Sequence, residues 1–255
     1  MRFEQIQQAL EGVPIMTAAQ GRVIYDHVLE SKPTDILELG TASGKSAAYM
    51  AAALHELGRG TVTTLDREQL LPKRLPEHHA FADVPELLSH VRFERPRHSS
   101  YVWWLLREIE SRSDAAGNCT PGYDFCYLDG AHDFTIDGLA AFLVEKLLRP
   151  DAWLLLDDLN WSYAADVVDF DRDTYSPDEA NAPHVRLIFD VLLKQHPNLT
   201  EFRVQDGTWG WAKKAPGQPR RYTVETSQSV GGLVVDRLKR AALTARSRQA
   251  VAGHR

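Results

Sequence analysis

The feature that most constrains the fold is an apolar segment at 35–39 that runs directly into a glycine-rich turn at 40–44. A second apolar segment, 61–65, follows a stretch with helical character and ends in Asp66. Parallel α/β sheets place their ligands at the carboxyl ends of the strands, next to turns of this kind. The sequence therefore predicts a ligand site at the edge of the sheet where both segments end.

Further strands are expected at 91–94, 124–128, 152–156, 199–204 and 208–212. Up to the fifth strand, helical segments separate the strands, which is typical of a parallel sheet covered by helices on both faces. Asp-Gly between the last two strands is a strong hairpin signal. We therefore predict a Rossmann-like, doubly wound α/β fold with a mostly parallel seven-stranded sheet and a C-terminal antiparallel hairpin.

The 255 residues are enough for one large domain. We expect N-terminal helices over 1–30, the main domain over 31–215 and a basic tail over 216–255. The tail carries eight Lys or Arg against two acids and contains an amphipathic helical pattern near 231–246. The helices at 1–30 and the tail offer surfaces for a homodimer.

Composition restricts the partners and the location. The net charge is −6, and because the tail is basic, the rest of the chain is strongly acidic. This charge argues against a nucleic-acid substrate, since neutralising phosphates supplies most of that affinity. No apolar stretch approaches the ~20 residues of a membrane span. The first residues lack the apolar centre of a signal peptide, so we expect a cytoplasmic protein with no membrane partner.

The glycine turn favours a ligand without phosphates. Its pattern is G-x-x-x-G, from Gly40 to Gly44, and not the G-x-G-x-x-G of dinucleotide sites or the longer spacing of a P-loop. At the tip of its strand, Asp66 is placed to accept hydrogen bonds from both hydroxyls of a ribose. Glu38 is placed to bind an ammonium group. The alternatives are a simple tight turn, a capping role for Asp66 and a buried structural acid at Glu38.

Four motifs in order carry a family resemblance: Glu-Leu-Gly-x-x-x-Gly, Leu-Asp-Arg, Leu-Asp-Gly-Ala-His and Leu-Leu-Asp-Asp. Together they resemble class I S-adenosylmethionine-dependent methyltransferases, in particular metal-dependent O-methyltransferases of the catechol and macrolide-sugar types. The resemblance covers about residues 12–212. It implies S-adenosylmethionine as the cofactor, held by a set of residues around the strand ends: Glu38, Gly40, Thr41, Ala42, Ser43, Gly44, Asp66, Ser99 and Asp129.

One segment departs from this resemblance. Many relatives carry an acid that contacts adenine where this chain has Arg95-Pro96-Arg97-His98-Ser99. Ser99, Ser100 and Tyr101 are the candidates to replace that acid. The adenine contacts are therefore the part of the cofactor site that the resemblance defines least.

Three acids, Asp129, Asp157 and Asp158, follow neighbouring strands of the predicted sheet. Carboxylates that crowd together must take up protons or a cation, and Mg²⁺ prefers oxygen ligands of this kind. Acids at matching positions hold the metal in the related enzymes, so a Mg²⁺ site is expected here. Alternatively, Asp157 or Asp158 caps the next segment, with Asn160 as a replacement ligand.

His132, three residues after Asp129, is the expected general base. Its offset matches that of the base in the related enzymes, and an ordinary pKa of about 6.5 suits proton transfer near neutral pH. The alternative is a structural loop histidine. Trp161 and Tyr163 follow the acid pair and are candidates to stack on the substrate, or else are packing residues.

These expectations converge on methyl transfer from S-adenosylmethionine to a hydroxyl of a small molecule with Mg²⁺ assistance, using His132 and Asp129 as catalytic residues. Two other functions remain open. In one, His132 is the only base and the acids are structural, so no metal is needed. In the other, the chain is a diverged or non-catalytic protein that binds an adenosyl ligand. The missing third glycine disfavours a nicotinamide-dependent oxidoreductase.

Overall fold

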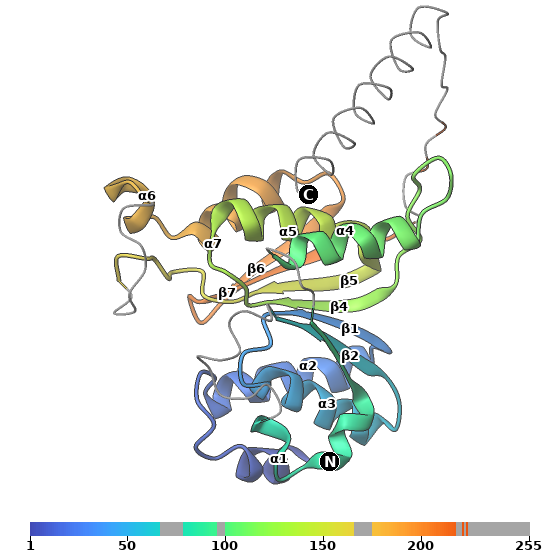
Figure 1. Ribbon diagram of the computed structural model, residues 1–255, viewed down its shortest axis with the longest axis vertical. Coiled ribbons are helices and arrows are strands. Elements are labelled where there is room, and N and C mark those ends of the chain that lie inside the picture. The colour runs from blue at the N-terminus through green and yellow to red at the C-terminus, as the bar shows by residue number, and fades with distance from the viewer. Residues whose placement is uncertain (67–78, 96–99, 166–174, 218–220, 222, 224–255) are drawn as a thin grey trace, which may run out of the picture. The chain divides into compact units, whose positions relative to one another are not determined.

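A seven-stranded sheet with the order β3-β2-β1-β4-β5-β7-β6 forms the centre of the fold (Figure 1). The computed structural model describes residues 1–66, 79–95, 100–165, 175–217, 221 and 223. The first five strands pair in parallel, and β7 is antiparallel to both of its neighbours. This arrangement confirms the predicted fold class. The strands are β1 (Asp35–Leu39), β2 (Thr61–Leu65), β3 (Val91–Glu94), β4 (Tyr123–Leu128), β5 (Leu148–Leu156), β6 (Leu199–Gln205) and β7 (Trp209–Lys214).

Helices cover both faces of the sheet (Figure 1). One face carries α1 (Phe3–Ala9), α2 (Ala18–Ser31) and α3 (Lys45–Leu57), and the other carries α4 (Tyr101–Ser111), α5 (Phe134–Leu147) and α7 (His184–Leu187). Short elements complete the described chain: η2 (His79–Phe81), η3 (Pro85–His90), α6 (Pro177–Asn181), η4 (Ile188–Leu192) and η5 (Leu193–Gln195). Residues 184–195 form a continuous run of α, π and 3-10 turns.

The core lies in two apolar layers, one on each side of the sheet. The alanines of α3 that face the sheet layer are fully buried: Ala47, Ala48, Ala51 and Ala52. Strand β1 is buried on both faces, as parallel strands between helical layers usually are. Within the described ranges, no helix has the length and apolar character needed to cross a membrane.

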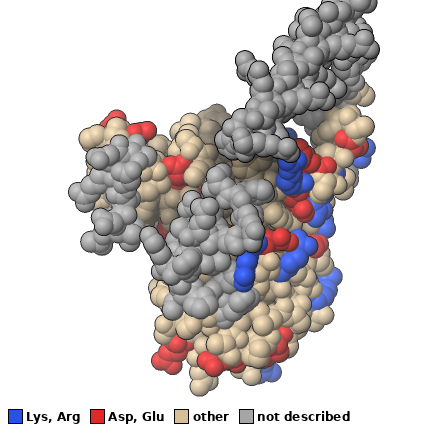
Figure 2. All heavy atoms as spheres, viewed as in Figure 1, with Lys and Arg blue, Asp and Glu red and all other residues tan. Residues whose placement is uncertain are grey.

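The chain divides into two compact units, 1–220 and 221–255. The second unit lies almost entirely outside the described residues, as do Ser99 and the amphipathic segment expected near 231–246. On the face shown in Figure 2, lysine and arginine side chains alternate with acidic ones and form no broad basic patch among the described residues.

Three backbone hydrogen bonds join the strand ends. Gly40 N donates to Leu65 O at 2.9 Å and Asp129 N donates to Leu39 O at 2.9 Å. Asp157 N donates to Leu128 O at 3.0 Å. The carboxyl ends of β2, β1, β4 and β5 are therefore fixed side by side, and the polar residues that follow them share one edge of the sheet.

Candidate active site at the strand ends

The turn after β1 requires a glycine at position 40, both because a side chain would clash there and because the backbone has a positive φ. Gly40 has a φ of +106°, and a Cβ at this position would overlap the backbone carbonyl oxygen of Asp129. Gly44, with a φ of +82°, is the N-cap residue of α3. The absence of a side chain at Gly40 therefore allows the ends of β1 and β4 to approach each other closely.

The other predicted turn residues lie together around this glycine. The backbone N–H of Ala42 donates to Asp66 Oδ2 at 2.9 Å, and the hydroxyls of Thr41 and Thr64 are 2.6 Å apart. Ser43 is buried, and its hydroxyl has no hydrogen-bond partner among the described residues. The turn thus ties the Asp66 carboxylate to its own backbone, and the contact of Asp66 with a ribose stays a prediction.

Glu38 lies at the end of β1 and is fully buried. It accepts hydrogen bonds from Ser46 Oγ, at 2.5 Å, and from the hydroxyl of Thr64. Burial raises the pKa of Glu38 to about 8, although the two hydroxyl donors act in the opposite direction. The described contacts of this acid therefore tie β1 to α3 and β2, and its binding of an ammonium group stays a prediction.

The acidic edge brings together Asp129, His132 and Asp158. His132 Nε2 lies 3.4 Å from Asp129 Oδ1 and 3.2 Å from Asp158 Oδ2. One ligand atom from each of the three residues lies within 4.8 Å of the other two. We call these residues the Asp-His-Asp group, and they are the described donors best placed to hold a cation together.

The position of His132 determines its protonation. Burial alone would lower the pKa of His132, but the carboxylates of Asp129 and Asp158 outweigh it and raise the pKa to about 9. Despite these two short approaches, Nε2 makes no hydrogen bond of good geometry with a described residue. The imidazole therefore faces the space between the carboxylates without a directional bond to either.

Asp157, predicted as a third ligand, lies outside this group. It is buried and accepts hydrogen bonds from Trp209 Nε1 at 2.6 Å, from Asp158 N at 2.7 Å and from the Tyr127 hydroxyl. Burial, and then the charges of Asp129 and Asp158, raise its pKa to about 7. These hydrogen bonds join the end of β5 to β4 and β7. The Asp157 carboxyl group is therefore turned toward the core and not toward the Asp-His-Asp group.

Asn160, named as a replacement ligand, is also engaged elsewhere. Its Nδ2 donates to Gly207 O at 2.7 Å, and its Oδ1 accepts from Arg186 at 3.0 Å. The side chain is exposed and links the loop after β5 to the β6–β7 hairpin. These contacts favour a role in the loop.

Comparison with known proteins identifies the central part of the chain. Residues 37–159 match the family described as a methyltransferase domain, and these residues contain the glycine turn and the Asp-His-Asp group. Residues 37–159 form a methyltransferase domain. No curated protein sequence matches the chain.

Solved structures share the fold of this methyltransferase. The O-methyltransferase TomG of Streptomyces achromogenes, in complex with SAM, has a TM-score of 0.55 and 19% identity, over 84% of this chain and 89% of its own. The Bacillus cereus O-methyltransferase in complex with SAH has a TM-score of 0.55 and 20% identity, over 83% and 90%. SAH-bound PaMTH1 of Podospora anserina has a TM-score of 0.58 and 16% identity, over 83% and 86%.

Trp161 and Tyr163, the predicted substrate residues, occupy different positions in this methyltransferase. The Trp161 ring lies 4.7 Å from the His132 ring, so it forms a wall beside the Asp-His-Asp group. Tyr163 is buried and stacks on Tyr175 at 4.4 Å. Its hydroxyl donates to Ala131 O at 3.3 Å, which places it behind the loop that carries His132. Of these two side chains, Trp161 is therefore the one that lies beside the Asp-His-Asp group.

Sequence reasoning missed the residues that support this loop. Tyr101 was a candidate for the adenine contact, yet its hydroxyl donates to Asp137 of α5. Tyr175 donates to Asp133 Oδ2 at 3.2 Å, and Asp133 caps α5 through the backbone N–H groups of Thr135 and Ile136. A buried acid among the apolar residues of a helix, as at Asp137, is the signal that would have indicated such a contact.

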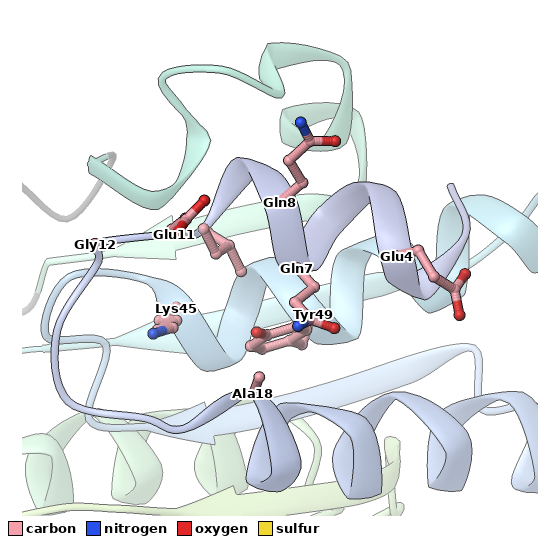
Figure 3. A pocket seen from close by; sticks show the side chains of 9 residues that line it. Glu4, Gln7, Gln8, Glu11, Gly12, Ala18, Lys45 and Tyr49 are labelled. Atoms are coloured by element: carbon pink, nitrogen blue, oxygen red, sulfur yellow. The ribbon is translucent and has the colours of Figure 1, made fainter.

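A hollow of about 520 Å³ lies apart from the Asp-His-Asp group, between α1, the beginning of α2 and α3 (Figure 3). Lys45 and Tyr49 of α3 belong to its lining. The Lys45 amine donates to Val13 O and so ties the segment before α2 to the beginning of α3. The lining shares no residue with the turn at 40–44 or with the Asp-His-Asp group.

Proposed function

We propose that this methyltransferase transfers a methyl group from S-adenosylmethionine to a hydroxyl oxygen of a small molecule, with a divalent cation, Mg²⁺, assisting. The observation that carries this proposal is the convergence of Asp129, His132 and Asp158 at the strand ends, beside the glycine turn. A proton acceptor and a cation site therefore share the edge of the sheet where the fold places its cofactor.

The residues of the turn suit the cofactor. The buried Ser43 hydroxyl lacks a described partner, and the turn around Gly40 contributes backbone groups without a side chain in the way. The relatives TomG and PaMTH1 are described with SAM and SAH, respectively. For this chain, we propose that Asp66 binds the ribose and that the turn at 40–44 binds the amino-acid end of S-adenosylmethionine.

The donor set suits a divalent cation. Two carboxylates, from Asp129 and Asp158, supply the oxygen atoms that Mg²⁺ prefers, and their combined charge requires compensation. Mg²⁺ at these residues would lower the pKa of a hydroxyl and orient it. The nearby imidazole of His132 would then accept the proton that the hydroxyl releases.

The chain's own residues orient the two reactants and accept the proton. The methyl group leaves the sulfonium sulfur as the hydroxyl oxygen forms its new bond, and the hydroxyl proton passes to His132 Nε2. A negative oxygen and a positive sulfonium neutralise each other in this step, so orientation and exclusion of water matter most. Trp161, beside His132, supplies an aromatic wall against which an acceptor can be held.

Calorimetric titration of S-adenosylhomocysteine, with Mg²⁺ and then with chelator, tests the cofactor assignment. Micromolar binding supports it, and absence of binding under both conditions would remove the basis of the proposal. Transfer of labelled methyl groups to a panel of phenols, catechols and sugars then tests the acceptor class. Transfer that chelator leaves unchanged would favour the metal-independent alternative, in which His132 is the only base and the acids are structural.

Asp157 and Asp158 are adjacent, yet their substitution is expected to have different effects. Asp158→Asn removes a carboxylate from the Asp-His-Asp group and should lower the Mg²⁺-stimulated rate about a hundredfold, because cations supply several kcal/mol of charge stabilisation. Asp157→Asn should keep Mg²⁺ stimulation but lower the free energy of unfolding by about 1–3 kcal/mol through disturbed buried hydrogen bonds. Rates at varied Mg²⁺ and urea unfolding measure both effects. Equal loss of Mg²⁺ stimulation in the two variants would contradict this assignment.

The pH dependence should shift with the cation. In chelator, His132 keeps its proton until the pH approaches about 9, because Asp129 and Asp158 favour the imidazolium. An imidazolium cannot accept a proton, so the rate should rise with pH up to about 9. With Mg²⁺ at the carboxylates, the rise should occur at lower pH. Identical rate profiles with and without Mg²⁺ would count against a cation at these residues.

The same group makes a stability prediction that is independent of activity. Because the pKa of His132 is raised on folding, its contribution is complete below the unfolded value of about 6.5. It is lost as the pH rises through about 9. The difference in unfolding free energy between the wild type and His132→Gln, measured in chelator, should shrink over this range.

A further inference from the structure

The loop that carries His132 is held by side chains from three other segments. The backbone N–H of Ala131 lies 3.1 Å from the Tyr101 hydroxyl oxygen and 3.2 Å from Asp137 Oδ1. Its carbonyl oxygen accepts from the Tyr163 hydroxyl at 3.3 Å. Tyr101, Asp137 and Tyr163 thus fix both polar groups of Ala131, the residue before His132.

Asp137 is an unusual residue for its position. It is fully buried within the first turns of α5, and a buried carboxylate costs free energy unless it is hydrogen-bonded. The Tyr101 hydroxyl donates to it, the Ala131 N–H faces it, and the positive end of the helix dipole favours it. A carboxylate in this setting receives several donors at once and fixes them relative to α5.

The contact between Tyr101 and Asp137 explains why the Asp-Gly-Ala-His motif contains a glycine, Gly130. A Cβ at Gly130 would overlap the Tyr101 hydroxyl oxygen and lie 2.6 Å from Asp137 Oδ1. Only a residue without a side chain allows the loop to approach this pair so closely. The glycine therefore belongs with Tyr101 and Asp137, which lie on other parts of the chain.

The geometry of His132 depends on the same peptide. His132 has a φ of +55°, in the left-handed region that few non-glycine residues adopt, and such conformations persist where the surroundings enforce them. Turning the Ala131–His132 peptide would move the imidazole from its place between Asp129 and Asp158. We infer that Tyr101 and Asp137 are positioning residues for His132, a role that rests on the proposed proton transfer.

Tyr101→Phe tests this inference, with Tyr123→Phe as the matched control. Tyr123 is also buried, and its hydroxyl also donates to a carboxylate, Glu108 Oε1, at 3.1 Å, away from the loop. A displacement of about 1 Å can cost about a hundredfold in rate, so we expect Tyr101→Phe to lower kcat about 10- to 100-fold. KM for S-adenosylmethionine and Kd for S-adenosylhomocysteine should stay within about twofold of wild type, since the glycine turn is untouched.

The control variant distinguishes a positioning role of Tyr101 from a purely structural one. Equal kcat values for Tyr101→Phe and Tyr123→Phe, at similar Tm, would overturn the positioning role and leave a structural one. Asp137→Asn keeps an oxygen that can accept from Ala131, so it should retain more kcat than Asp137→Ala. The reverse order of these two variants would also overturn the inference.

Amide hydrogen exchange separates this inference from the proposed function. Exchange at Ala131 and His132 in the full chain should become at least about tenfold faster in Tyr101→Phe and stay unchanged in Tyr123→Phe. If exchange is unchanged in both variants, the inference that Tyr101 fixes the loop is wrong, whatever the activity of the variants. Failure of the wild type to bind S-adenosylhomocysteine would instead count against the proposed function, while the exchange result still tests the contact.

Discussion

Gly40→Ala is expected to abolish detectable binding of S-adenosylhomocysteine. At a φ of +106°, an alanine is strained by about 1–3 kcal/mol from the backbone alone. Its Cβ would also overlap the carbonyl oxygen of Asp129, so β1 and β4 would have to separate at their carboxyl ends. That movement would displace both the turn at 40–44 and the Asp-His-Asp group. Calorimetry with S-adenosylhomocysteine, together with Tm, measures the effect.

Gly58→Ala is the matched control for this prediction. Gly58 ends α3 with a φ of +69°, and a Cβ there would meet no atom within 4 Å. The control therefore carries the conformational cost without the overlap, and we expect a lower Tm with an unchanged Kd. Wild-type affinity in Gly40→Ala would show that the strand ends tolerate separation and that the turn does not form the cofactor site.

The topology could be predicted because it follows from local patterns. Apolar runs of strand length, helical spacing between them and an Asp-Gly turn are all readable within short windows, and the sheet order confirms them. Boundaries were less accurate. The strand expected at 152–156 begins instead at Leu148, and a register shift between Tyr123 and Phe125 accommodates the extra residues. Asp151, with a φ of +64°, marks this irregularity.

The convergence of Asp129, His132 and Asp158 was also within reach of the sequence, because parallel strands end at one edge. The separate roles of Asp157 and Asp158 were not. Trp209 and Tyr127 decide which carboxyl group turns inward, and Trp209 lies 52 residues further along the chain. Likewise, the contact of Tyr101 with Asp137 depends on how α4 packs beside α5. Such pairings are set by tertiary packing, which no local pattern encodes.

A large loss of unfolding free energy is expected when one partner of a buried ion pair is removed. Lys214 of β7 and Glu145 of α5 form a buried ion pair, with 2.9 Å between Lys214 Nζ and Glu145 Oε1. The same amine donates to Glu145 O at 2.6 Å, and Asn198 Nδ2 donates to Glu145 Oε1 at 3.0 Å. Removing one partner leaves a charge buried without its counter-charge. Lys214→Met or Glu145→Leu should each lower the unfolding free energy, measured in urea, by about 3–5 kcal/mol.

Removing both partners should cost much less than the sum of the single changes. In the double variant Lys214→Met with Glu145→Leu, no buried charge of the pair remains, and apolar side chains of similar size fill its place. The exposed pair Lys194–Asp190, at 2.6 Å, serves as the control and should contribute less than about 1 kcal/mol. Additive losses in the double variant would mean that the pair stabilises the packing of β7 on α5 beyond what charge compensation explains. Unchanged S-adenosylhomocysteine affinity in all three variants is expected, because the pair joins elements at the opposite end of α5 from the loop that carries His132.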